Sequence, residues 1–163
     1  MGVAIEQVKN VHIWGNHSAT QFPSVYHGTV ADYPAAGFDQ PIDTAVADDE
    51  WLKGKFITDV QKRGAAIIKA RKKSSAASAA AAVCDHMHDW VWGSPEGEAV
   101  SMGVISDGNS YGIASDIVFS FPVTCKGGEW KIVDGYTHNS FAQDKLKKTE
   151  KELLEERKMA LGI

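Results

Sequence analysis

Six histidines give this sequence its clearest prospect of acid–base chemistry, because histidine alone titrates near neutral pH without help. His17 stands apart by its position: it follows a strand-like run, Val8 to Gly15, in the turn Gly-Asn-His-Ser. Strand ends commonly hold catalytic groups in enzymes built from helices and strands. A hydrogen-bonded loop histidine would give the same pattern and, on residue types alone, is the commoner case. Residue types therefore make His17 a candidate whose role stays open.

A second group, Cys84-Asp85-His86-Met87-His88-Asp89, has the residue types of a metal site. On a helix Cys84 and His88 would share a face, whereas His86 would point elsewhere. A tetrahedral zinc site needs three or four converging ligands, and no second Cys/His pair stands at finger-like spacing. We therefore predict no metal site. His12, His27 and His138 lack local partners in the sequence and receive no role.

Several well-known motifs are missing from the sequence. It contains no Gly-x-Gly-x-x-Gly after a strand, no P-loop and no Gly-x-Ser-x-Gly elbow. Its arginines number three, at positions 63, 71 and 157, so a bidentate clamp for a carboxylate is hard to assemble here. The sequence shows no nucleotide cradle of its own.

Two helices are expected in the middle of the chain. The first, 49–71, has Asp48 or Asp49 as its N-cap and an apolar face at steps of three and four residues. Gly64 interrupts it at a cost of roughly 0.5–1 kcal/mol, which suggests either a helix–helix contact or close approach of a ligand. The second, 75–90, begins at Ser74-Ser75 and is alanine-rich, so we expect it to be buried; its start is a weak candidate for anion binding.

The remaining segments complete an α+β fold, an antiparallel sheet packed against long helices. Ser24 to Val30 reads as a strand, and 31–47 reads as a surface excursion rich in small residues. The expected meander has three strands: 98–105, 117–124 and 130–133, with Pro122 placing its strand at an edge or in a bulge. A capping box at 140–143 opens a helix to 158 whose inner stripe consists of Ala142, Leu146, Thr149, Leu153 and Ala160, with its Lys/Glu-rich remainder in water.

Composition limits the classes of function. The length of 163 residues predicts one domain over 1–163, and 44% hydrophobic residues are typical of a globular protein. The net charge of −4 argues against nucleic-acid binding, and the sequence has no run apolar enough to span a membrane. Two cysteines make no disulfide framework and favour a reducing, cytoplasmic setting.

Longer motifs carry a resemblance to a known family. The run from Val8 to Pro23, VKNVHIWGNHSATQFP, resembles the start of the C-terminal half of the cytosolic-type malate dehydrogenases, in the lactate/malate dehydrogenase family. So do Trp51 to Arg71 with the Ser-Ser-Ala that follows, and the run from Pro95 to Gly112. The similarity extends from Gly2 nearly to the end of the chain. His12 departs from it, since an aliphatic residue is usual there.

The resemblance implies reversible oxidation of malate to oxaloacetate with a nicotinamide cofactor, NAD or NADP. His17 matches the family's general base, and Gly64 and Ser75 match positions that line the substrate and nicotinamide pocket. The family's N-terminal dinucleotide-binding domain has no counterpart in this sequence. We therefore expect the chain alone to bind no cofactor and to be inactive.

The resemblance also implies a homo-oligomer, because the family's dimer contacts involve the helix matched by Trp51 to Arg71. The face that would contact the nucleotide domain is expected to be uncovered in this chain, and exposed apolar surface of that kind also favours association. The alternative to an enzyme half is a non-enzymatic interaction or oligomerisation module that retained the family's assembly surface.

Overall fold

The structure, a computed structural model, describes residues 2–74 and 76–162. Its strands are β1 (Val8–Lys9), β2 (His12–Trp14), β3 (Phe22–Ser24), β4 (Thr29–Tyr33), β5 (Phe38–Pro41), β6 (Val100–Ile105), β7 (Val118–Lys126) and β8 (Glu129–Ile132). Its helices are η1 (Ile5–Gln7), α1 (Ile42–Val46), α2 (Asp49–Trp51), η2 (Leu52–Phe56), α3 (Ile57–Arg71), α4 (Ala76–Trp92) and α5 (Ser140–Leu161).

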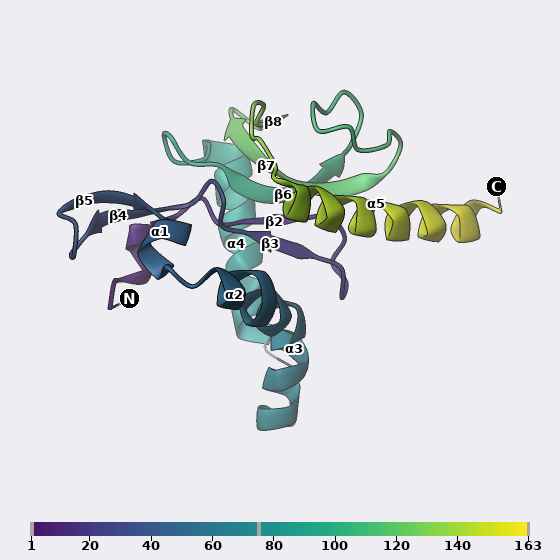
Figure 1. Ribbon diagram of the computed structural model, residues 1–163. Helices are drawn as coiled ribbons and strands as arrows, with labels where there is room; N and C mark the ends of the chain where they lie inside the picture. The colour runs from purple at the N-terminus through teal and green to yellow at the C-terminus, as the bar shows by residue number, and fades with distance from the viewer. Residues whose placement is uncertain (1, 75, 163) are drawn as a thin grey trace.

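The strands form three small sheets, in the orders β1-β4-β5, β2-β3 and β6-β7-β8, and each pairing between them is antiparallel. The meander β6-β7-β8 matches the prediction, and Gly127 and Gly128, both at positive φ, close the two-residue turn between β7 and β8. Figure 1 shows α5 lying along this sheet while α3 and the start of α4 extend away from it. The predicted α+β class is confirmed.

The main core lies between the meander, β2 and the first turns of α5. Apolar residues on one face of β6 and β7 point into it and alternate with exposed ones, as expected of a sheet with one buried face. Its fully buried members include Trp14, Phe119, Phe121 and Val123. A smaller cluster of Val25, Val30, Ile42 and Leu52 fills the space under β4 and α1.

Helix predictions hold best where the sequence is strongly periodic. Asp48 caps the helix that runs through α2, η2 and α3, accepting from the Trp51 N–H at 2.9 Å. The last helix is capped by Asn139, whose Oδ1 accepts from the Ala142 N–H at 2.9 Å, so the predicted capping box at Ser140 is wrong by one residue. Ala160, expected on its inner stripe, is exposed.

The predicted strands before residue 48 are wrong in detail. The run Val8 to Gly15 breaks into two strands at Asn10, whose positive φ of 55° leaves the strand region. A turn at 25–28 likewise separates β3 from β4 within the predicted strand. The expected surface excursion over 31–47 contains the end of β4, all of β5 and α1.

Pro122 lies in the central strand of its sheet, not at an edge. Its carbonyl accepts from the Val133 N–H at 3.0 Å, just beyond the end of β8. A residue in an antiparallel strand points its N–H and C=O to the same side, so the missing N–H falls where β8 has ended. The strand thus tolerates proline without a bulge.

The alanine-rich helix α4 was predicted to be buried, and that prediction is wrong. Its described residues are exposed or half-buried. Val83, Met87, Val91 and Trp92 expose between 46% and 76% of their surface. No helix among the described residues is long and apolar enough to cross a membrane.

Candidate functional site

His17 lies in the loop 15–21, between β2 and β3, and the sheet fixes the start of that loop. Strand β2 pairs with β3 and also crosses the meander, where Gly15 and Ser120 exchange backbone hydrogen bonds of 3.1 and 3.0 Å. Two serine side chains grip β2 in addition: the Ser120 hydroxyl donates to the Ile13 carbonyl at 2.6 Å, and the Ser101 hydroxyl accepts from the Ile13 N–H at 2.9 Å.

Helix α5 holds the loop from the other side. Thr149, fully buried, accepts from the Asn16 N–H at 2.8 Å, and its hydroxyl lies 2.9 Å from that of Thr20. Gly15 passes this threonine so closely that a Cβ on it would lie 2.2 Å from Thr149 Cγ2. With φ at +90°, the position suits glycine on both counts.

One turn further along α5, Glu152 receives three side chains of the loop. Its Oε2 accepts from the Ser18 hydroxyl at 2.5 Å, from the Thr20 hydroxyl, and from Asn16 Nδ2 at 3.3 Å. Burial acts to raise the pKa of the Glu152 carboxyl, but these hydrogen bonds and the charge of Lys148 outweigh it, so the pKa lies below its ordinary value. The carboxylate is therefore the stable form at neutral pH.

The loop borders a cavity of about 480 Å³ between β2 and the exposed face of the meander. The His17 cavity is lined by Ile13, Gly15, Asn16, His17, Gln21, Ser101, Gly103, Val118 and Ser120. His17 is exposed, so its imidazole can reach a ligand in this cavity. The volume falls within the range of small-molecule sites.

The other two predicted site residues are not among those that line the cavity. Gly64 is exposed in the middle of α3, and a Cβ there would meet nothing within 4 Å, so helix–helix contact within the described chain does not explain it. Its helix nevertheless reaches the site, because Gln61 Nε2 donates to the carbonyl of Gln21 at 2.8 Å. Ser75 lies outside the described residues.

Comparison with known proteins places the chain in a family. Residues 1–162 match the lactate/malate dehydrogenase, alpha/beta C-terminal domain. The chain belongs to this family. Cytoplasmic malate dehydrogenases of Zea mays and Homo sapiens are 56% and 55% identical to it over 160 residues, which cover 98% of this chain and 47% of each relative. The chain thus spans about half the length of the curated relatives it matches.

Solved structures of the lactate/malate dehydrogenase family share the fold. A lactate dehydrogenase of Trichomonas vaginalis, in complex with NADH and oxamate, superposes with a TM-score of 0.90 at 34% identity, over 99% of this chain and 48% of that one. A malate dehydrogenase of Naegleria fowleri gives 0.87 at 44% identity, over 99% and 47%. The family expected from the sequence motifs is confirmed.

Two histidines without a predicted role stack on one aromatic ring, and a third contacts one of them. Tyr136 stacks on His27, with ring centroids 4.0 Å apart, and on His12, with centroids 5.6 Å apart and a 3.4 Å contact from His12 Nε2 to the tyrosine hydroxyl. His138 contacts His27 and Trp14 edge-on. Burial, and next the charge of His27, lower the pKa of His12 to about 4 and also lower that of His138. His12 and His138 therefore act as neutral packing groups at pH 7.

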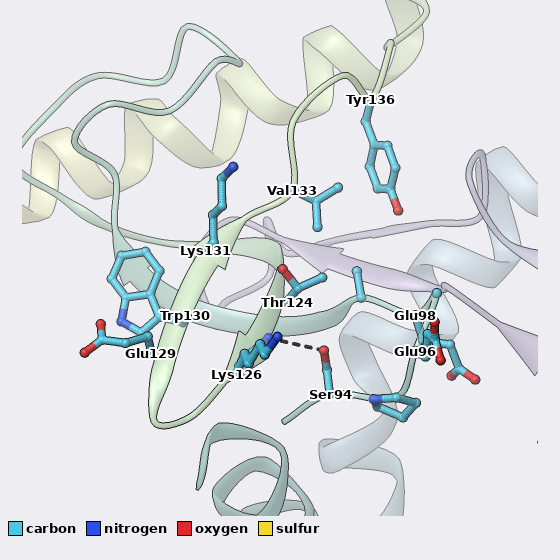
Figure 2. Close-up of a pocket in the computed structure, with 14 residues that line it drawn as sticks. Ser94, Glu96, Glu98, Thr124, Lys126, Glu129, Trp130, Lys131, Val133 and Tyr136 are labelled. Carbon is cyan, nitrogen blue, oxygen red and sulfur yellow. Dashed lines mark hydrogen bonds between the residues drawn. The ribbon is translucent and has the colours of Figure 1, made fainter. Parts of the chain in front are cut away.

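A larger cavity, of about 570 Å³, lies between the segment 94–99 and the hairpin β7-β8 (Figure 2). The Ser94 hydroxyl joins its two sides by accepting from the Cys125 N–H at 3.2 Å. Its charged side chains, Lys126 and Glu129 among them, are spread around the rim and do not converge on one point (Figure 2). This cavity lacks the converging polar groups that fix a ligand.

No group of three His, Cys, Asp or Glu side chains among the described residues could hold a metal ion. Cys84 is exposed, and His88 contacts the Asp89 carboxylate at 3.3 Å.

Proposed function

We propose that this chain is the catalytic half of a malate dehydrogenase, with His17 as its general acid and base. The observation that carries the proposal is 55–57% identity to cytoplasmic malate dehydrogenases over 98% of the chain. The exposed position of His17 at a cavity of substrate size supports it. The 34% identity to the Trichomonas vaginalis lactate dehydrogenase is much lower, which favours malate over lactate.

His17 would take the hydroxyl proton of malate onto its imidazole, and would return a proton to the carbonyl oxygen of oxaloacetate in the reverse direction. Histidine is the side chain that enzymes use most often as a general acid and base, since its imidazole can both accept and donate a proton. The loop's anchors on β7 and α5 would keep the ring at the cavity while the substrate binds. A nicotinamide cofactor supplies the hydride acceptor of this reaction.

The residues of this chain fit the reacting end of such a cofactor but not its nucleotide end. The His17 cavity and the open space beside Gly64 could receive the nicotinamide and substrate. The sequence offers no glycine-rich phosphate loop for the remainder. We propose that NAD or NADP is bound mainly by a dinucleotide-binding domain that lies outside 1–163, and that this chain alone binds no cofactor and turns over no substrate.

The test is an absorbance assay of NADH oxidation with oxaloacetate, and with pyruvate for comparison. The chain is assayed alone, then mixed with the separately produced N-terminal half of the Zea mays enzyme. We expect activity with oxaloacetate in the mixture only. In the mixture His17→Asn should lower kcat by about 10²–10⁴-fold, whereas His88→Asn, at an exposed histidine of α4, should not change it. Full turnover by the lone chain, or full activity of His17→Asn, would refute the proposal.

We further propose a cytoplasmic homo-oligomer with no nucleic-acid or membrane partner. The relatives are named cytoplasmic, and the net charge of −4 disfavours nucleic acid. The exposed apolar side chains on α3 and α4, Ile68 and Trp92 among them, support an assembly surface. They equally favour the alternative of a non-enzymatic oligomerisation module, which predicts an oligomer but no activity in the mixing assay.

A further inference from the structure

The loop that carries His17 has no regular secondary structure over 16–20, yet its polar side chains converge on one atom. Glu152 Oε2 accepts from Asn16 on one side of the histidine and from Ser18 and Thr20 on the other. A carboxylate oxygen binds several donors at once and makes hydrogen bonds roughly twice as strong as a neutral acceptor does. Glu152 therefore joins the two flanks of the histidine.

The ring of His17 has no hydrogen-bond partner of its own among the described residues, and the side chain is exposed. Within the described residues, only the backbone on either side of it sets the direction of the imidazole. Thr149 holds that backbone at Asn16, and Glu156 contacts Asn16 Nδ2 at 3.0 Å, but both contacts precede the histidine. The side-chain contact that directly follows it is the one from Ser18 to Glu152.

We propose that Glu152 is a positioning residue, whose carboxylate clamps Asn16, Ser18 and Thr20 and so aims His17 at its cavity. The proposal rests on the proposed role of His17. A displacement of about 1 Å in a reacting group can cost about 10²-fold in rate. Loss of the clamp should therefore lower kcat while the fold persists.

Helix α5 offers a matched control. Glu155 lies three residues further along the same helix, exposed, with its carboxylate 3.7 Å from Lys151. The substitutions Glu152→Gln and Glu155→Gln each remove one negative charge from α5 and keep the side-chain shape. Only the first replaces an oxygen that the loop uses, so a difference between them reports the clamp and not the net charge.

The first measurement uses this chain alone: ¹⁵N relaxation order parameters of the amides at 16–20 in the wild type, Glu152→Gln, Glu152→Ala and Glu155→Gln. We expect rigid values of about 0.85 in the wild type and the control, and values below about 0.6 in Glu152→Ala, with Glu152→Gln between them. Amides of β6 and β7 should not change in any variant. A loop as rigid in Glu152→Ala as in the wild type would overturn the proposal.

The second measurement uses the mixture with the N-terminal half of the Zea mays enzyme. We expect Glu152→Ala to lower kcat at least tenfold with little change in KM, because the substrate still binds while the base is misplaced. Glu155→Gln should retain wild-type kinetics. A mobile loop with unchanged kcat, or a rigid loop with reduced kcat, would also overturn the proposal. If the wild-type mixture shows no activity, the proposed function fails while the relaxation result still decides whether the clamp exists.

Discussion

Acid should unfold this chain more readily than its surface carboxylates alone would require, because His12 is buried as a neutral imidazole. It is 1% exposed on β2, and its Nδ1 has no hydrogen-bond partner among the described residues. Burial, and next the charge of His27, lower its pKa from 6.5 to about 4. In the unfolded chain the same imidazole takes up a proton near pH 6.5. Between these two pH values the unfolded state binds more protons, so the free energy of unfolding must fall as the pH falls.

The size of the effect follows from the gap between the two pKa values. At about 1.4 kcal/mol per pKa unit, His12 contributes a loss of about 1.4 kcal/mol by pH 5.5 and about 3 kcal/mol by pH 4. The stability is fully present above pH 6.5. Urea unfolding followed by tryptophan fluorescence, at pH 7, 5.5 and 4.5, measures the free energy of unfolding along this range.

The variant His12→Leu isolates the contribution, since leucine fills the buried site and does not titrate. It will shift stability at pH 7 through lost contacts with Tyr136, so the informative quantity is the slope with pH. We expect the variant to lose less stability than the wild type by the amounts above, and the exposed His88→Leu to keep the wild-type slope. Equal slopes for the wild type and His12→Leu would show that His12 titrates normally and that our account of its burial is wrong.

Three further outcomes are expected. Gly15→Ala should lower the free energy of unfolding by roughly 2–5 kcal/mol, from overpacking against Thr149 and a strained φ, as measured by urea unfolding. Gly64→Ala should raise it by about 0.5–1 kcal/mol, because a Cβ there meets nothing, yet lower kcat/KM in the mixture with the N-terminal half. Light scattering should show an oligomer of the chain that Ile68→Glu, on the exposed face of α3, converts to monomer without unfolding it; a monomeric wild type would contradict this.

Much of the fold could be predicted because its signals are local. The helix from Asp49 to Arg71 begins with a capping aspartate and keeps a period near 3.6 residues, and the meander alternates with a period of two. The strand breaks were not predictable in the same way. Asn10 leaves the strand because its Oδ1 accepts from the Ala99 N–H at 3.0 Å, a contact between residues 89 positions apart.

In the candidate site, too, the residue with a local sequence signal could be predicted and the residue that depends on distant contacts could not. His17 could be singled out from its turn and from the family motif, but Glu152 could not, because a glutamate in a Lys/Glu-rich helix has the pattern of a solvated face. We predicted that this part of α5 faces water, and that is wrong for Glu152, whose partners lie more than 130 residues away. Burial of α4 was expected because alanine permits close packing, yet the described residues leave most of this helix exposed. Residue types show which contacts a helix face could make, but the tertiary structure decides whether another segment lies close enough to form them.

The contacts that anchor the loop of His17 indicate which part of the proposed enzyme would hold the base and which part would bind the cofactor. Both supports of its loop, the backbone pairing with Ser120 and the side chains of α5, belong to the described residues. Under the proposed function, the contacts that hold the backbone beside the general base therefore belong to this chain. Cofactor binding has no such support here, since the sequence lacks a phosphate loop. Under the proposed function, a dinucleotide-binding half would then supply binding and orientation of the nicotinamide to a base already in place, and mixing two separately folded halves should suffice to produce activity.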